Sequence, residues 1–237
     1  MSETHHRRDG TDAQARHARR AALYGYASTA LQYPDRETVG DLTDAETAAA
    51  VREAAAVLDL GDELAALQRA AETTSRDALA ATYDGLFGIP GDDGTYPVVP
   101  YEANYTTGAE INEIQRRIAT VVGLLAEFGL QLDSDFDERQ DHVAVELELL
   151  AVVAAQRAVA LDEGEEAAAR RLARAEATVL DEHLTGFVPA LSTAVDRATD
   201  SDFYRAATDF AAALVNADHA AHDPIPTPSH RPGGETQ

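Results

Sequence analysis

The segment DERQDHVAVELELL, residues 137–150, is the stretch of this chain that decides its fold. Asp141 and His142 stand side by side before a run of valine, alanine and leucine that is apolar on nearly every face. A helix that is apolar all round is buried in a protein core. The segment therefore predicts a central helix with Asp141 as its N-cap, and with its first turn where the core meets solvent.

Two further carboxylates lie inside this helix, and the spacing sets which residues share a face. His142 and Glu146 are four residues apart and lie together, while Asp141 and Glu148, seven apart, share a neighbouring face. An acid–histidine pair followed by carboxylates is compatible with a metal site, a proton-transfer site, or a helix start beside a recognition surface. The residues alone leave a purely structural role and a binding role open.

Local motifs argue against the two chemical alternatives. The His-Glu-x-x-His string of zinc hydrolases is absent, and the Glu-x-x-His spacing of di-iron bundles occurs only at Glu3 and His6. No Gly-x-Ser-x-Gly nucleophile turn is present. His17 stands at the edge of the first predicted helix, and only His142 and His183 lie well inside predicted helices, so we expect no metal site, no cofactor and no catalytic residue.

Composition indicates a soluble chain adapted to salt. The 237 residues suit one domain with tails, cysteine is absent, and 42 acidic residues face 19 basic ones, all arginine, for a net charge of −23. This pattern is typical of a haloarchaeal-type organism. At molar salt the Debye length is about 3 Å, so the acidic surface reflects the solvent rather than a basic partner. A nucleic-acid partner is excluded because no basic face is evident.

No segment is long and apolar enough to span a membrane. The longest uncharged run, residues 21–34, has 14 residues, and a spanning helix needs about 20. Arg19 and Arg20 before it mimic a twin-arginine export signal, but Tyr33-Pro34-Asp35 favours a soluble first helix that stops there. We expect a cytoplasmic protein.

The periodicity predicts an all-α fold, a single-domain bundle of about eight to nine helices with one long ordered loop. The domain covers residues 16–216, between a mobile N-terminal tail of residues 1–15 and a disordered Pro/Gly-rich tail of residues 217–237. Helices are expected at 16–32, 44–59, 62–72, 75–87, 108–130, 141–161, 165–184, 187–198 and 201–216. Ser75 and Asp200–Ser201 are further caps.

The long loop, FGIPGDDGTYPVVPYEANY at residues 87–105, is the one clear break in the helical pattern. Three prolines and three glycines prevent helix, whereas its phenylalanine and tyrosines favour an ordered, packed loop. Glu102 lies between Tyr101 and Tyr105 on a turn stiffened by Pro97 and Pro100. Such a turn suits either a packed corner or the edge of a peptide groove.

Taken in order, several segments resemble the TorD/DmsD/NarJ family of redox-enzyme maturation chaperones. YDGLFGIPG and YPVVPYEANY resemble the family's Leu-Phe-x-x-Pro and Pro-Pro-(Tyr/Trp)-Glu loop, and ERQDHVAVELELLAVV its Glu-Arg-x-Asp-His signature. VLDEHLTGFVPAL, SDFYRAATDFAAALV and AALYGYASTALQYPD are similar to three further family segments. The likeness spans about residues 20–216, and Ala103-Asn104 departs from the usual Ser/Thr after the loop glutamate.

The resemblance implies a non-enzymatic, system-specific chaperone. It would bind the apo catalytic subunit of a molybdopterin-dependent oxidoreductase of the DMSO reductase/nitrate reductase type through the subunit's twin-arginine signal peptide. It would assist cofactor insertion and delay export, as a monomer or a homodimer. The implied client-binding residues are Tyr101, Glu102, Asp141, His142, Glu146 and Glu148, supported by the loop residues Leu86, Phe87, Pro90, Pro97, Pro100 and Tyr105.

Two other functions stay open. One is a small-molecule or nucleotide-dependent enzyme that uses Asp141, His142 and Glu146, although no glycine-rich phosphate loop of the P-loop type occurs. The other is a structural helical subunit of a larger complex.

Overall fold

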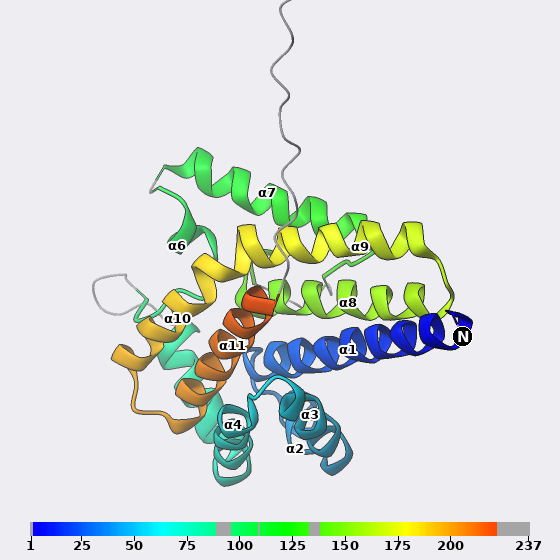
Figure 1. Ribbon diagram of the computed structural model, residues 1–237. Helices are drawn as coiled ribbons and strands as arrows, with labels where there is room; N and C mark the ends of the chain where they lie inside the picture. The colour runs from blue at the N-terminus through cyan, green and yellow to red at the C-terminus, as the bar shows by residue number, and fades with distance from the viewer. Residues whose placement is uncertain (1, 89–95, 109, 133–137, 222–237) are drawn as a thin grey trace, which may run out of the picture.

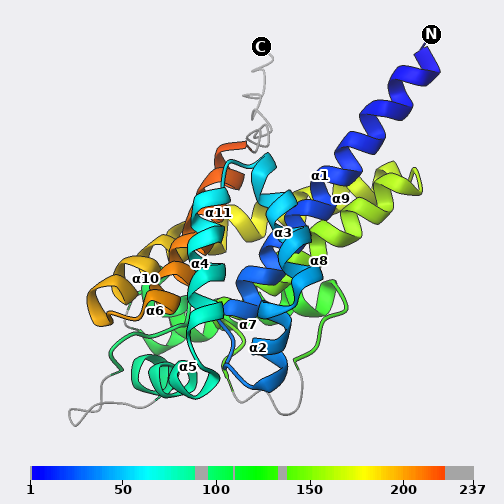
Figure 2. The ribbon, with the colours of Figure 1, turned by 90° about the horizontal axis from the view of Figure 1, so that it is seen from below.

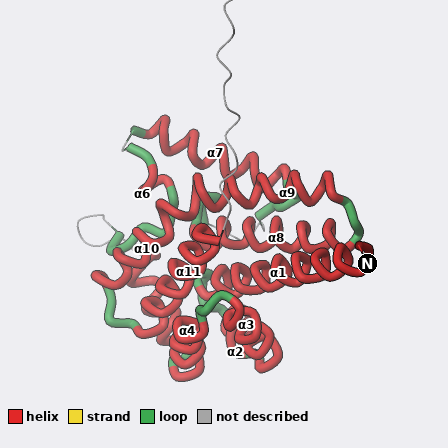
Figure 3. Tube along the Cα trace, viewed as in Figure 1, coloured by secondary structure: helices red, strands yellow, loops and turns green. Residues whose placement is uncertain are grey.

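The computed structural model describes residues 2–88, 96–108, 110–132 and 138–221, and the side chains from residue 12 onward. Helices make up almost all of these residues, and no β-strand occurs in these ranges (Figure 3). The all-α prediction is confirmed. No helix in the described ranges combines the length and the apolar character needed to cross a bilayer.

The helices and their bounds follow the chain. The N-terminal half contains α1 Ser2–Ala30, α2 Arg36–Thr43, α3 Ala45–Val57, α4 Gly61–Thr73, α5 Arg76–Tyr83 and the π-helical segment η1 Asp84–Gly88. The C-terminal half contains α6 Ala103–Thr106, α7 Ile111–Glu127, α8 Val143–Asp162, α9 Glu166–Thr178, the π-helical segment η2 Val179–Leu184, α10 Thr185–Ala198 and α11 Asp202–Ala221.

Helix α8 is the centre of the bundle, as its composition predicts. It runs antiparallel to α1 along most of its length and packs against α9 on the other side (Figure 1). Leu147, Leu150 and Val153 are fully buried between these neighbours. Helix α11 packs against α10 and α4, while α2 and α3 lie beside α1 (Figures 1 and 2). The apolar surface of α8 is thus covered from several directions at once.

Short polar residues mark where helices begin, and glycines mark where two of them end. The side chains of Asp35, Asp44 and Ser75 accept hydrogen bonds from the backbone N–H of Thr38, Thr47 and Ala78 at 2.8, 2.8 and 3.3 Å. Gly129 and Gly164 follow α7 and α8 with φ of 73° and 71°, the left-handed conformation that glycine adopts without strain. The predicted Ser75 cap is confirmed.

Helix α2 and the short α6 were missed, and the predicted gap between residues 184 and 187 is absent. The chain stays helical from α9 through η2 into α10, with Pro189 inside α10. The N–H of Thr185 bonds to the carbonyl of Leu180, five residues back, so a π-helical turn precedes the proline. The extra residue in this turn lets one helix carry on where a plain α-helix pattern predicts two.

The ends of the chain differ from the expected tails. Helix α1 begins at Ser2, so it includes most of the range predicted to be a mobile tail, and in Figure 2 its first turns extend beyond the body of the protein. Helix α11 continues to Ala221, five residues past the predicted domain end at 216. Residues 222–237 lie outside the described ranges, and the division into one domain and two tails stays a prediction.

A buried ionic network joins the first and last helices. The Arg20 guanidinium of α1 donates to Glu176 of α9 at 2.9 Å and to Asp218 of α11 at 2.7 Å. Arg157 of α8 also donates to Glu176, at 2.5 Å, and the Tyr24 hydroxyl donates to Asp218 at 2.9 Å. Arg20, Glu176 and Asp218 are all at most 4% exposed, so these charges depend on one another rather than on water.

We expect Arg20→Ala to lower the free energy of unfolding by roughly 3–5 kcal/mol, because it leaves two buried carboxylates short of a cation. Urea denaturation followed by circular dichroism measures this change. Arg170→Ala, which removes an exposed pair with Glu166 on α9, is the matched control and should cost less than about 1 kcal/mol. Equal losses in the two variants would contradict the importance of the network.

The same network predicts a particular acid response. Burial alone would raise the pKa of Glu176, but the hydrogen bonds and charges of His17, Arg20 and Arg157 lower it to about 2. Since the unfolded chain takes up this proton near pH 4.5, the stabilisation is complete above that pH and is lost as the pH falls towards 2. The contribution is on the order of 3 kcal/mol. Unfolding free energies of the wild type and Glu176→Gln between pH 2.5 and 7 should therefore converge as the solution becomes acidic.

Candidate functional site

The loop at residues 97–102 and the start of α8 are joined by backbone hydrogen bonds. Tyr101 and His142 form an isolated antiparallel bridge. The N–H of Glu102 donates to the carbonyl of Asp141, and the N–H of Val143 to the carbonyl of Pro100, both at 2.9 Å. The loop therefore packs against the start of this helix.

Asp141 does not cap α8, which corrects the sequence prediction. Its carboxylate accepts two bonds from Arg139, at 2.9 and 2.6 Å, and one at 3.1 Å from the N–H of Ala103 in the first turn of α6. Arg139 also lies over the ring of Tyr101, 4.4 Å from its centroid. Asp141 is fully buried, so it works as an internal clamp that fixes the loop to the helix.

His142 takes the capping position instead. Its Nδ1 accepts from the N–H of Ala144 at 3.2 Å, so Nδ1 carries no proton. A neutral imidazole then has its proton on Nε2, which lies 3.4 Å from the Tyr83 hydroxyl and donates to it. Burial lowers the pKa of His142 to about 3, which agrees with a ring that stays neutral.

Glu102 lies inside the protein at the centre of a second set of contacts. Its Oε1 is 3.4 Å from the Arg117 guanidinium of α7 and 3.3 Å from the Thr106 hydroxyl. Its Oε2 is 3.1 Å from Nδ1 of His183, which η2 carries. Sequence reasoning counted His183 as a core histidine but did not place it at the site. The one signal that includes it is the segment VLDEHLTGFVPAL.

Glu146 completes this interior cluster one turn into α8. It is 1% exposed, and no N–H group or hydroxyl of the described residues donates to its carboxyl oxygens, whose polar neighbour is the Glu102 carboxylate. Burial, followed by the charges of Glu102 and Asp141, raises the pKa of Glu146 well above its usual range. Burial therefore favours the neutral, protonated form of Glu146, in contrast to a carboxylate that an arginine accompanies.

The supporting residues of the loop are mostly packed as predicted. Leu86, Phe87 and Pro100 are buried, and the ring of Phe87 stacks edge-on against Tyr83 and Tyr204 at 5.1 and 5.8 Å. Tyr105 packs against Phe187 of α10, with ring centroids 5.2 Å apart. Pro97 is exposed, and Pro90 lies outside the described residues.

The six predicted client-binding residues thus divide into two groups. Glu102, Asp141, His142 and Glu146 are at most 1% exposed, so an external molecule reaches them only if the loop opens. Tyr101 is half-buried, and its hydroxyl donates to Glu138, while Glu148 is exposed. In the closed arrangement only Tyr101 and Glu148 can contact a partner.

An apolar pocket of about 160 Å³ adjoins the outer face of α8 at Glu148. It lies between the end of α1, the end of α7 and the first turns of α8, one turn away from the Asp141 clamp. Its lining consists of Gln32, Leu125, Leu130, Gln131, Leu132, Ala144, Val145 and Glu148. Three leucines and a single carboxylate make it suited to an apolar side chain with a cation beside it.

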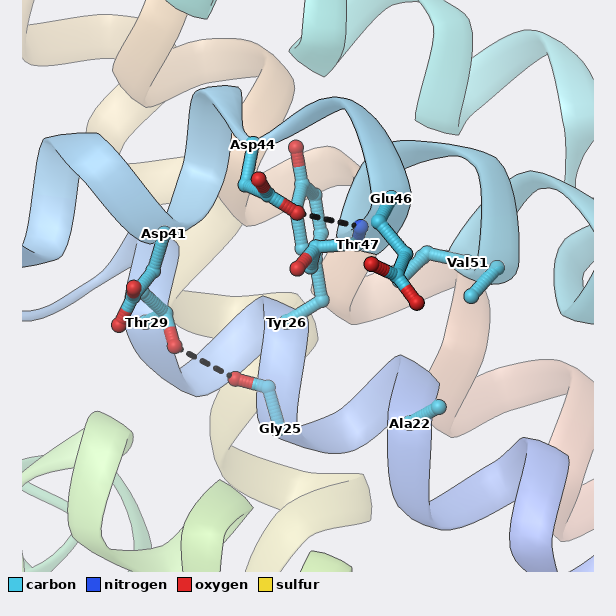
Figure 4. A pocket seen from close by; sticks show the side chains of 10 residues that line it. Ala22, Gly25, Tyr26, Thr29, Asp41, Asp44, Glu46, Thr47 and Val51 are labelled. Atoms are coloured by element: carbon cyan, nitrogen blue, oxygen red, sulfur yellow. Dashed lines mark hydrogen bonds between the residues drawn. The ribbon is translucent and has the colours of Figure 1, made fainter.

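A larger cleft of about 530 Å³ opens between α1, α2 and α3 (Figure 4). Asp41, Asp44 and Glu46 gather on the α2–α3 side, opposite Gly25 of α1. Asp44 is already engaged as the cap of α3, and exposed carboxylates cover much of so acidic a chain. None of the predicted site residues lines this cleft.

Comparison with known proteins gives two results. The sequence profile of the family described as the nitrate reductase delta subunit matches residues 41–193. The chaperone protein TorD of Photobacterium profundum is 28% identical over 168 residues, which cover 68% of this chain and 74% of that protein. The profile match contains the loop, the Asp141–His142 pair and His183, so it takes in every part of the interior cluster.

We expect the neutral His142 to leave a pH signature. Because its folded pKa of about 3 lies below that of the unfolded chain, near 6.5, it stabilises the fold above pH 6.5 and less as the pH falls. His142→Asn keeps a capping acceptor and should weaken the loss of stability between pH 6.5 and 4. His142→Ala should in addition cost about 1 kcal/mol for the cap at every pH. Urea unfolding across this range measures both, and a His142 ring that titrates near 6.5 by NMR would contradict the assignment.

Proposed function

The chain belongs to the nitrate reductase delta subunit family, and from that premise we propose a maturation chaperone, not an enzyme, as its function. Its client is the catalytic subunit of a molybdopterin-dependent oxidoreductase of the DMSO reductase/nitrate reductase type. The chaperone binds the apo subunit through its twin-arginine signal peptide, assists cofactor insertion and delays export until the client has folded. It acts in a salt-adapted cytoplasm.

The apolar pocket beside Glu148 is the observation that carries the proposal. A twin-arginine signal peptide has a pair of cations followed by an apolar core. The pocket offers leucine side chains for the apolar part, and Glu148 at its edge is a carboxylate that solvent reaches. Asp141 and Glu102 are less suited to the client's arginines, because Arg139 and Arg117 already pair with them in the interior.

The buried residues of the site would act by positioning. Asp141 and His142 set the direction in which α8 starts, and the same helix presents Ala144, Val145 and Glu148 to the pocket. Tyr101, which lies under the Arg139 guanidinium, is the half-buried loop residue of the predicted set that a client can still contact. Burial of about 400 Å² of client surface at ~25 cal/mol per Å² gives on the order of 10 kcal/mol, much of it offset by ordering and association, so micromolar affinity is reasonable.

The two alternatives find less support in the geometry. An enzyme using Asp141, His142 and Glu146 would need substrate access to side chains that are at most 1% exposed. A structural subunit would need a permanent interface, and the large apolar residues that the described chain exposes, such as Val57, Ile111 and Val159, come from different helices. The proposal includes a monomer or a homodimer as the active form, and co-purification with a client would distinguish the two.

We expect Leu132→Ala to weaken binding of a fluorescein-labelled twin-arginine signal peptide by about five- to tenfold, since it removes one wall of the apolar pocket. Glu148→Gln should weaken binding less, through the lost contact with a client arginine. Fluorescence anisotropy titration measures both. Affinity should fall only slightly between 0.5 and 3 M salt, because apolar contact rather than long-range attraction supplies most of it.

Two variants serve as matched controls. Val122→Ala shortens an exposed apolar side chain on α7, and Asp162→Asn removes an exposed carboxylate at the far end of α8. Neither should change the affinity. Equal effects of Leu132→Ala and Val122→Ala, or a steep loss of affinity with salt, would count against the pocket. Failure to capture any apo molybdoenzyme subunit would count against the chaperone function itself.

A further inference from the structure

Three potential metal ligands from distant parts of the chain meet in the interior. Glu102 comes from the end of the loop, Glu146 from α8 and His183 from η2. One carboxylate oxygen from each glutamate and one imidazole nitrogen lie within 4.8 Å of one another, and all three side chains are at most 1% exposed. We call this set the interior triad.

Two members of the interior triad have polar atoms without partners. Both carboxyl oxygens of Glu146 and the Nε2 atom of His183 are buried, and no N–H group or hydroxyl of the described residues bonds to them. A buried polar atom without a partner costs about 1–3 kcal/mol, so native proteins rarely keep several of them in one place. The nitrogen of His183 that faces the glutamates is Nδ1, so the oxygens of Glu146 are the atoms that point to a bound group.

The charges around the interior triad point to a cation. Arg117 lies 3.4 Å from Glu102, and Arg139 binds Asp141 at 2.6 Å. No ion pair joins Glu146 to an arginine or histidine within the described part of the chain. Three carboxyl groups therefore share two arginines, and a bound positive ion would take the place of the proton that the third, Glu146, favours in the metal-free protein.

We propose that the interior triad binds one divalent first-row transition metal ion, of the class of Zn²⁺, Mn²⁺ or Fe²⁺. Carboxylate oxygen and imidazole nitrogen are the donors that these ions share. Neighbouring ligand atoms on a tetrahedral ion, each about 2.1 Å from it, are about 3.4 Å apart. His183 Nδ1 and Glu102 Oε2, at 3.1 Å, already approach this spacing, and Glu146 would give up its proton rather than an ion pair when it binds.

The neighbours of the triad suit the outer contacts of such a site. Arg117 and Thr106 contact Oε1 of Glu102 and leave Oε2 directed towards His183. Outer contacts of this kind orient ligands and raise metal affinity. The ion would connect the loop, α8 and η2 in one place, so its binding should stabilise the folded protein whether or not a client is present.

The test uses the full-length protein, stripped with a chelator and titrated with Zn²⁺ in excess Mg²⁺ and high salt, which suppress binding to the acidic surface. We expect about one tight Zn²⁺ per chain by calorimetry and a rise in the melting temperature of roughly 5–10 °C. Substitution by Co²⁺ should give the visible absorption of a site with nitrogen and oxygen ligands. Glu146→Gln and His183→Gln should each lower the affinity at least 100-fold.

Glu127→Gln, which removes an exposed carboxylate at the end of α7, is the matched control and should bind Zn²⁺ like the wild type. Melting curves of the metal-free variants establish that each is folded. If Glu146→Gln unfolds, His183→Gln and the cobalt spectrum of the wild type decide the matter. Absence of a stoichiometric ion in the wild type, or equal Zn²⁺ binding by the wild type and both triad variants, would overturn the proposal and leave adventitious surface binding only. Neither result depends on the client.

Discussion

The candidate site depends on one short contact, the backbone pairing of residues 100–102 with residues 141–143. Two hydrogen bonds of 2.9 Å and an isolated bridge hold the loop against the start of the central helix. This pairing puts the Asp141 carboxylate at the N–H of Ala103 and turns Glu102 inward, towards Glu146 and His183. Asp141 and Glu102 are buried. Their charges are therefore tolerated in the interior only when the pairing brings the partner groups to them.

A chaperone that recognises an unfolded client gains from such an arrangement. The surface that contacts the client must be adaptable, whereas the helix that presents it must start in one place and one direction. Buried charge pairs are poor sources of net stability but are well suited to specifying a single arrangement, since every alternative leaves a charge unpaired. All the basic residues of this chain are arginine, which suits buried charge pairs of this kind. An arginine keeps its charge when buried and binds a carboxylate through two parallel bonds, as Arg139 binds Asp141.

Sequence patterns predicted the parts of the structure that depend on local chemistry. The central position of residues 143–153 followed from their uniformly apolar character, and the Ser75 cap from its spacing. The capping role of Asp141 was predicted wrongly, because a local rule cannot know that Arg139 and the N–H of Ala103 compete for its carboxylate. His183 was not placed at the site, since 81 residues separate it from Glu102 and only the fold brings them to 3.1 Å. The continuous helix through Pro189 was missed because a π-helical turn leaves no simple periodicity.

The ionic network between the first and last helices has a consequence for how this protein is made. Arg20 and Asp218 are 198 positions apart, so their contact closes a loop that spans most of the chain, at an entropic cost of about 5 kcal/mol. On the ribosome, α1 emerges with a cation whose second carboxylate has not yet been synthesised. Until α11 has been synthesised, Arg20 lacks Asp218 as a partner. The contact between α1 and α11 is therefore among the last that the growing chain can form, after α1 has already packed along α8.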